Sequence, residues 1–177
     1  TFFDTLGPRE VDLGFRRPDR LQAYGAPPIR VTEELAAREV KELKPGVWIY
    51  DLGQNIAGAV RLKVKGVAGT RVQLRFGEML HSDGRLMTEN LRRARATDFY
   101  TLRGDTAGEV WQPRFTYHGF RYVEVTGLDS NPGLGAIVGL VLHNDTPRVG
   151  EFACSDALMT RFWKNTQWTQ RANFVEM

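Results

Sequence analysis

Two neighbouring segments of the chain alternate between apolar and polar side chains with a period of two. They are AVRLKVK at residues 59–65 and RVQLRF at residues 71–76. Successive side chains of a strand point to opposite faces, so this period predicts two strands that each bury one face. The short connection GVAG between them predicts an antiparallel hairpin. The residues expected to face inward are Val60, Leu62, Val64, Val72, Leu74 and Phe76.

Further short strands are predicted along the chain. VWIYDLG at residues 47–53 is rich in β-forming residues and ends at a glycine, and TDFYTLR at 97–103 predicts another strand. GDTAGE at 104–109 predicts a turn, and VWQPRFTYHGFRYVEVTG at 110–127 predicts one long bent strand or two. GAIVGLVLHN at 135–144 is apolar on both faces, as expected of a central strand. With no alternation of strands and helices, the pattern predicts a mainly β fold, an antiparallel β-sandwich of the jelly-roll type.

The first part of the chain has no such period. FRRPDRLQAYGAPP at residues 15–28 is rich in proline, and we interpret residues 1–27 as a linker or the remnant of a preceding domain. PIRVTEELAAREVKELK at 28–44 is compatible with a short helix or an extended edge, and we favour an extended connection into the sheet. The opening TFFDTLGPRE lacks an initiator methionine and a signal-peptide pattern, so we expect a processed or excised piece.

The alternation breaks within RFTYHGFRYVEV at residues 114–125. Its first two aromatic residues occupy odd positions and its last two occupy even positions, so one strand cannot place all four on one face without an extra residue. The break falls at His118-Gly119 and suggests a β-bulge.

Two interpretations of this break are open. A bulge could present His118 as a general base, or His118 could be a hydrogen-bonded structural residue beside a glycine that allows a bend. No serine or cysteine lies in a nucleophile elbow, so we favour the structural interpretation. A bulge residue often needs a positive φ, which predicts that Gly119→Val destabilises the fold more than His118→Ala.

The last segment changes period. Ser155 is expected to cap a helix, with Asp156 in its first turn, and apolar residues then recur at helical spacing through residue 174. These residues are Leu158, Met159, Phe162, Trp163 and Trp168. An apolar surface of this size usually finds a partner, so we expect either a neighbouring domain or self-association through this helix.

Composition narrows the class of protein. The net charge is +3, from 24 basic and 21 acidic side chains, which is too balanced to indicate a nucleic-acid partner, and no apolar run is long enough to span a membrane. Cys154 is the single cysteine, which excludes an internal disulfide and favours a reducing compartment such as the cytoplasm.

Two groups of residues could form a site. Five acidic residues could form a catalytic pair or a calcium site; they are Asp51, Glu78, Glu89, Asp98 and Asp105. They are scattered along the sequence, whereas calcium sites usually take closely spaced acidic residues, so we favour solvated positions at strand ends and turn caps. Four aromatic residues could form a stacking platform for a sugar; they are Trp48, Trp111, Tyr117 and Tyr122. Aromatic residues of strands more often belong to the core, which we favour. No metal or cofactor is predicted.

Three arginines, Arg92, Arg93 and Arg95, cluster in ENLRRARATD at residues 89–98. A nucleic-acid patch would need more basic neighbours and interleaved aromatic residues, and Glu89 and Asp98 flank the cluster instead. We therefore favour a surface loop or an interdomain contact with carboxylates, which guanidinium groups suit.

Three long motifs in order carry a resemblance to a known family. They are YDLGQNIAGAVRLKVKGVAGTRVQLRFGEML, TENLRRARATDFYTLRG and WQPRFTYHGFRYVEVTGL. Over residues 28–177 the chain resembles the concanavalin-like β-sandwich of bacterial α-L-rhamnosidases, and GEFACSD with the following helix resembles the linker and first helix of their (α/α)₆ catalytic barrel.

The resemblance implies a division of the chain and a role for it. Residues 28–146 would form the sandwich, and residues 147–177 would form the linker and the first helix of a catalytic domain. The family hydrolyses terminal α-L-rhamnose with inversion by means of two carboxylates that lie in the barrel, so none of them is assigned here, and the isolated chain is expected to be inactive. The expected partner is the remainder of the enzyme. The alternatives are an autonomous carbohydrate-binding module that takes a rhamnose-containing glycoside, and a stand-alone interaction domain with no role in sugar binding. Candidate interdomain or sugar contacts are Arg92, Arg93, Trp111, Tyr117, His118 and Arg121.

Overall fold

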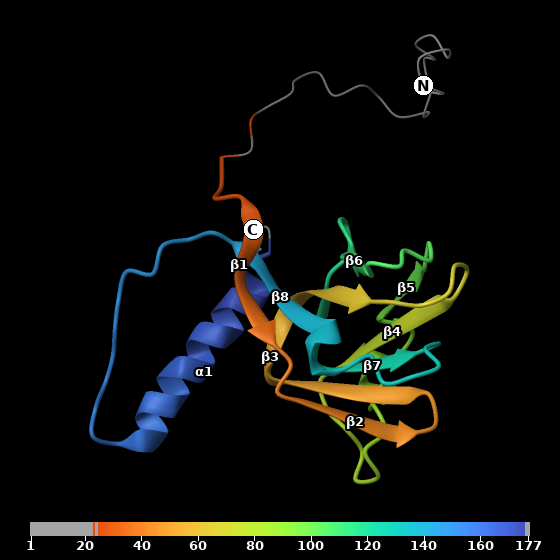
Figure 1. Cartoon of the computed structure of the whole chain (residues 1–177). Coiled ribbons are helices and arrows are strands. Elements are labelled where there is room, and N and C mark those ends of the chain that lie inside the picture. Colours follow the sequence, from red (N-terminus) through yellow and green to blue (C-terminus); the bar gives the residue numbers. More distant parts are fainter. Residues whose placement is uncertain (1–22, 24, 176–177) are drawn as a thin grey trace.

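The computed structural model describes residues 23 and 25–175, which form antiparallel strands followed by one α-helix (Figure 1). The strands are β1 (Ile29–Ala36), β2 (Glu39–Lys44), β3 (Val47–Val64), β4 (Arg71–Gly77), β5 (Thr97–Thr101), β6 (Glu109–Trp111), β7 (His118–Thr126) and β8 (Ile137–Asn144). The helix is α1 (Ala157–Asn173), and two short 3₁₀ helices are η1 (Glu89–Leu91) and η2 (Leu134–Ala136). The predicted antiparallel β fold with a C-terminal helix is confirmed.

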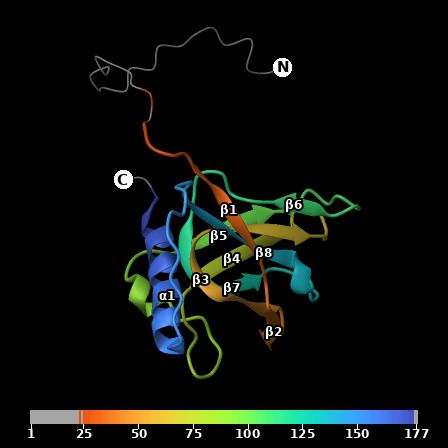
Figure 2. The same cartoon turned by 90° about the vertical axis from the view of Figure 1, so that its left-hand side faces the viewer.

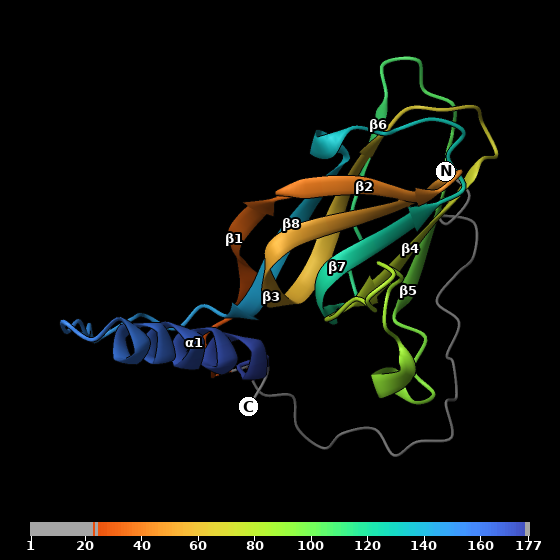
Figure 3. The ribbon, with the colours of Figure 1, turned by 90° about the horizontal axis from the view of Figure 1, so that it is seen from below.

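Strand β3 joins the two halves of the sheet. Its first residues pair with β2 on one side and β7 on the other, and its second half pairs with β8, β6 and the start of β7. The strand order is β1-β8-β3-β7-β4-β5, with β2 and β6 as further partners of β3. The layers of the predicted sandwich are thus parts of one hydrogen-bonded sheet, which curls around the core (Figure 3).

The core lies on the inner side of this curl. All six residues predicted to face inward from β3 and β4 are buried, so that prediction is confirmed. Phe120, Val123 and Val125 of β7 and Ile137 and Val141 of β8 join the same apolar cluster. Because both halves of the sheet contribute to one cluster, neither half has a core of its own.

The predicted hairpin between residues 59–65 and 71–76 is wrong. Both segments are strands, but β7 lies between β3 and β4 in the sheet. The period of two determines which face of a strand is buried and says nothing of which strand pairs beside it. Gly53 also does not end the first predicted strand, because β3 continues through it to Val64.

The predicted bulge at His118-Gly119 is wrong as well. Strand β7 begins at His118, and Phe115 and Tyr117 precede it, 96% and 51% exposed. The odd and even aromatic residues therefore never share one strand. Gly119 is exposed, its φ is not positive, and an added Cβ would meet only Glu78 Oε1, at 4.0 Å.

The ends of the described chain test three other predictions. Residues 28–44 are extended, as expected, and form β1 and β2. The helix begins one residue later than predicted: Asp156 is the N-cap and accepts hydrogen bonds from the backbone N–H groups of Leu158 and Met159, so Ser155 is not the cap. Most of residues 1–27, which we interpreted as a linker or the remnant of a preceding domain, lie outside the described residues, so that interpretation stays a prediction. No helix of the described part is long and apolar enough to cross a membrane.

A buried carboxylate closes the turn between β5 and β6. Glu109 is 3% exposed and accepts hydrogen bonds from the Tyr100 hydroxyl, at 2.6 Å, and from the backbone N–H groups of Arg103, Gly104 and Asp105. The Tyr100 hydroxyl and these N–H groups lower the pKa of Glu109 from 4.5 to about 2, because they stabilise its charged form. The carboxylate therefore holds Tyr100 of β5 and three backbone N–H groups of the turn in one geometry.

This clamp predicts a pH-dependent stability. Because the folded pKa of about 2 lies below the ordinary 4.5, the stabilisation from Glu109 is complete above pH 4.5 and is lost as the pH falls toward 2. Glu109→Gln should lower the melting temperature by several degrees at pH 6, and the difference from wild type should shrink toward pH 2.5. Thermal unfolding across this range measures it, with exposed Glu151→Gln as the control. A constant difference across the range would contradict the assignment.

Candidate functional site

The most irregular part of the sheet lies where β3 passes β7. Asp51 pairs with Tyr122 and Ile56 pairs with Phe120, so β3 advances five residues while β7 advances two. Gly53 lies within this break at a φ of 73°, which a glycine adopts without strain, and its N–H donates to Asp51 Oδ1 at 2.6 Å. Among the extra residues of β3, Asn55 reaches Glu78 at the start of the loop of residues 78–96.

Arg121 and Asp51 form a two-point ion pair at this break. Arg121 Nε donates to Asp51 Oδ1 at 2.8 Å, and its Nη2 donates to Oδ2 at 2.7 Å. The hydrogen bond from Arg121 holds the pKa of Asp51 below its usual value. The Arg121 guanidinium also lies 5.0 Å from the ring of Tyr122. Arg121 thus fastens β7 to the break in β3.

His118 makes a second contact from β7. Its ring stacks on Phe76 with centroids 4.3 Å apart, and its Nε2 lies 3.1 Å from Asp98 Oδ1 of β5. Both side chains are largely enclosed, 15% and 10% exposed. Asp98 Oδ2 is buried with no hydrogen-bond partner among the described residues. His118 therefore joins β7 to β5 across the end of β4, the structural role favoured from the sequence.

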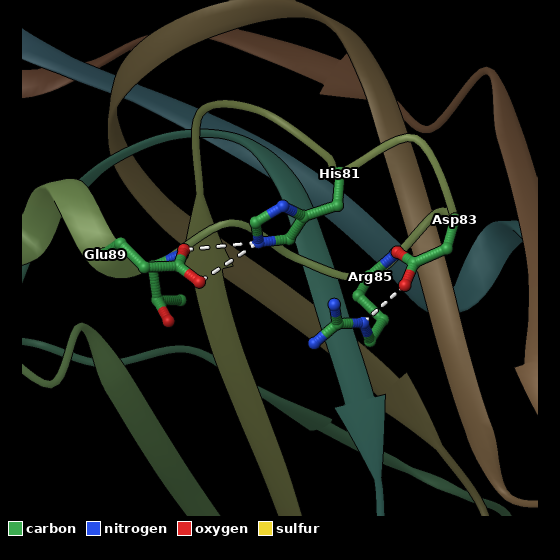
Figure 4. A network of polar contacts seen from close by, with 5 residues as sticks. His81, Asp83, Arg85 and Glu89 are labelled. Atoms are coloured by element: carbon green, nitrogen blue, oxygen red, sulfur yellow. Dashed lines mark hydrogen bonds and ion pairs between the residues drawn. The ribbon is translucent and has the colours of Figure 1, made fainter.

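The loop of residues 78–96 is held by contacts of its own. His81 Nε2 lies 3.2 Å from both carboxylate oxygens of Glu89, and Arg85 donates to Asp83 at 2.6 Å (Figure 4). An isolated antiparallel β-bridge pairs the backbone of Leu80 with that of Leu86, and the Leu86 side chain is buried.

The same loop is anchored to the break in β3. Asn55 Nδ2 donates to Glu78 Oε1 at 2.8 Å. At the other end of the loop, the N–H of Phe76 donates to the carbonyl of Ala96 at 3.0 Å. The loop is thus fixed at both ends as well as internally.

The three arginines of the loop of residues 78–96 are exposed to solvent. Arg92, Arg93 and Arg95 are exposed, and their guanidinium groups make no hydrogen bond or ion pair with the described residues, whereas Asp83, Glu89 and Asp98 are already engaged. Arg92 and Ala96 have φ values of 56° and 35° and are the two non-glycine residues with positive φ in the described chain. Such backbone is unfavourable by about 1–3 kcal/mol per residue and is often found at binding sites.

The remaining candidates are dispersed. Trp111 of β6 stacks on Tyr100, with centroids 5.2 Å apart, and is half-buried. Tyr117 is exposed just before β7, whereas Trp48 is 6% exposed and belongs to the core, as favoured from the sequence. His118 and Arg121 thus both act from β7 on neighbouring strands, Arg92 and Arg93 lie in the loop of residues 78–96, and the four aromatic residues do not assemble into a platform.

The acids do not gather either. Asp51, Glu78, Glu89 and Asp98 each contact a different partner, and Asp105 accepts from the N–H of Ala107 within its own turn. The described residues contain no group of three or more His, Cys, Asp or Glu side chains that could hold a metal ion.

Comparison with known proteins identifies the fold and its family. The model of the bacterial α-L-rhamnosidase concanavalin-like domain matches residues 41–143. The chain belongs to this family. An α-L-rhamnosidase of Streptomyces avermitilis is 47% identical over 160 residues, which are 90% of this chain and 15% of the relative.

Solved structures agree with the match. The crystal structure of the Streptomyces avermitilis α-L-rhamnosidase complexed with L-rhamnose superposes with a TM-score of 0.82 at 49% identity, over 85% of this chain and 14% of that one. The α-L-rhamnosidase from Dictyoglumus thermophilum gives a TM-score of 0.82 at 38% identity, over 85% of this chain and 17% of that one. The concanavalin-like chain thus spans about 15% of the length of the curated relatives that it matches.

Two features of the structure were not predicted from the sequence. Glu109 was not singled out, although it follows a turn-forming stretch that leaves several backbone N–H groups without strand partners. The pairing of Arg121 with Asp51 joins residues 70 apart in sequence, and only the register of β3 against β7 brings them together.

The structure reverses the sequence-based prediction about His118 and Gly119. His118→Ala should lower the free energy of unfolding by about 2–3 kcal/mol, because it removes a ring contact and leaves the buried Asp98 carboxylate without its partner. Gly119→Ala should change it by less than about 0.5 kcal/mol, since the added methyl group meets only Glu78 Oε1, at an ordinary contact distance of 4.0 Å. Denaturant unfolding measures both, and His118→Phe separates the ring contact from the hydrogen bond. A Gly119→Ala chain as unstable as His118→Ala would restore the bulge model.

Proposed function

We propose that this chain is the non-catalytic β-sandwich part of an α-L-rhamnosidase that hydrolyses terminal α-L-rhamnose from glycosides with inversion. Residues 28–146 form the sandwich, and residues 147–177 lead into the catalytic part. The observation that carries the proposal is the match to α-L-rhamnosidases over 90% of the chain and only 15% of the relative. Inverting hydrolysis needs two carboxylates with room for a water between them, and the acids at the candidate site are instead tied to structural partners.

The loop of residues 78–96 supplies one contact with the rest of the enzyme. Its carboxylates are satisfied within the chain, while Arg92, Arg93 and Arg95 point outward from a loop that is already ordered. An ordered loop loses little conformational entropy on binding, and a guanidinium pairs well with a carboxylate. The fitting partner is a surface of the catalytic part that carries aspartate or glutamate.

The helix α1 supplies a second contact. Leu158, Met159 and Phe162 are 74%, 48% and 65% exposed, while Trp168, nearer the C-terminal end, packs against the core cluster. The N-terminal half of α1 thus extends beyond the sheet (Figure 3) and carries an apolar surface that the catalytic part would cover. In the isolated chain the same surface is free to pair with a second copy, and self-association through it remains a prediction.

The proposal predicts where activity resides. The purified chain should release no measurable aglycone from an aryl α-L-rhamnoside. The Streptomyces avermitilis enzyme, with its matching segment replaced by this chain, should fold and keep activity because the scaffold is similar. Turnover by the isolated chain that survives purification by a second method would refute the proposal, and so would a folded chimera without activity.

The arginine contact predicts a charge effect in that chimera. Reversing Arg92 and Arg93 to glutamate should lower the stability of the chimera by roughly 1–2 kcal/mol, because two ion pairs become repulsive. The same reversal in the isolated chain should leave its melting temperature unchanged, since neither side chain has a partner among the described residues. Lys41 and Lys44, both exposed, give a control with the same change of net charge. Equal effects of the two double reversals on the chimera would remove the arginine contact and leave the scaffold role standing.

A further inference from the structure

A polar pocket lies between α1 and the β1–β8 edge of the sheet, far along the sheet from the arginine loop. Helix α1 lies on the side of the molecule that faces the viewer in Figure 2, and it is tied to the sheet at its C-terminal end, where the Phe174 carbonyl accepts from the N–H of Asn144 at 2.7 Å. The pocket has a volume of about 450 Å³, within the usual range for small-molecule sites. Its walls come from β1, the end of β8, the segment 145–150 and α1.

The floor of the pocket is built from buried polar groups. His143 of β8 is 8% exposed, its Nδ1 lies 2.7 Å from the Asn144 carbonyl oxygen, and its Nε2 lies 2.8 Å from Thr32 Oγ1. The carbonyl can only accept, so Nδ1 carries the hydrogen. His143 is thereby fixed, and it holds the Thr32 hydroxyl at the edge of the pocket.

The wall formed by α1 is also ordered. With its amide oriented to suit its neighbours, the Gln167 oxygen accepts from Trp163 Nε1 at 3.3 Å and from Arg148 Nε at 3.2 Å. This leaves the Gln167 amide N–H₂ free to donate and fixes the Trp163 indole in the wall. Thr166 and Gln170 add a hydroxyl and a second amide to the lining.

Two ion pairs border the pocket. Arg171 Nη1 lies 3.2 Å from Glu33 Oε2, and Arg30 Nη1 lies 3.7 Å from Asp145 Oδ2. Arg148 is engaged with the Gly150 carbonyl and with Gln167. Both of these partners are neutral, so Arg148 keeps its charge, while the other two guanidinium groups are paired with carboxylates. Because the remaining groups of the lining are hydroxyls and amides, it suits a neutral ligand that both donates and accepts hydrogen bonds.

We propose that this pocket binds a neutral pyranose sugar. Amides, hydroxyls and a carboxylate match the alternating donor and acceptor character of sugar hydroxyl groups, and the indole of Trp163 offers an apolar surface for the C–H groups of a pyranose ring. The site would hold a sugar without cleaving it, and residues of this chain form all of its described lining.

The test is sugar binding to the whole chain. Ligand-observed NMR and calorimetry with L-rhamnose, D-glucose and D-glucuronate should show saturable binding of at least one neutral sugar, with glucuronate no tighter. Gln167→Ala and Trp163→Ala should each weaken that binding by about tenfold or more, and Trp163→Phe should weaken it less. Asn165→Ala, on the exposed side of α1 and outside the pocket, should leave it unchanged.

Three results would overturn the proposal. They are no saturable binding of either neutral sugar, binding that Gln167→Ala and Trp163→Ala leave intact, and glucuronate binding tenfold tighter than the neutral sugars, which would mark an anion site. If Trp163→Ala does not fold, Gln167→Ala and Thr166→Val decide alone. Because this assay uses no catalytic part, its failure leaves the rhamnosidase chimera as an independent test.

Discussion

The fold depends on one strand that both halves of the sheet share. Where β3 passes from one half to the other, Gly58 pairs with His118 of β7 and Val141 of β8. A Cβ at this residue would lie 1.9 Å from the Leu140 carbonyl oxygen, so only a glycine lets β8 approach this closely. Just before this point, the break at residues 52–55 lets β3 turn. The curl of the sheet, and with it the single core, follows from these two features.

The same strand positions the candidate site. Because β3 advances five residues against two of β7, Asp51 reaches Arg121, and Asn55 reaches Glu78 at the start of the loop. A regular ladder continued from the Asp51–Tyr122 pair would instead set Leu52 opposite Arg121 and Asn55 opposite His118, without the extra residues of the break. The irregularity therefore has a structural cost that the ion pair and the ordered loop offset. This geometry supports a surface for contact with another domain.

The sequence predicted the parts of this arrangement that depend on local pattern. Alternation identified the buried face of Val60 and Leu62, and helical spacing identified α1. The pattern did not predict which strands pair. Strand β7 lies between β3 and β4, and the period of two does not encode a partner such as β7, which lies about 50 residues from β4 in the sequence. The odd and even positions of the aromatic residues wrongly predicted a bulge at His118, because Phe115 and Tyr117 lie outside the strand. For the site, Arg92 and Arg93 were identified as a cluster, while the hydrogen bonds of Glu109, His143 and Gln167 depend on contacts that the fold creates.

Hydrogen exchange on Gly58→Ala compared with Gly135→Ala tests most directly whether β3 unites the sheet. An added methyl group at Gly135 meets no atom within 4 Å, so this variant controls for the loss of a glycine. If β3 holds both halves together, Gly58→Ala should reduce amide protection in β4 and β7 as well as in β1 and β8, and should lower the free energy of unfolding by about 3 kcal/mol or more. Loss of protection confined to β1 and β8, or a stability equal to that of Gly135→Ala, would contradict this account.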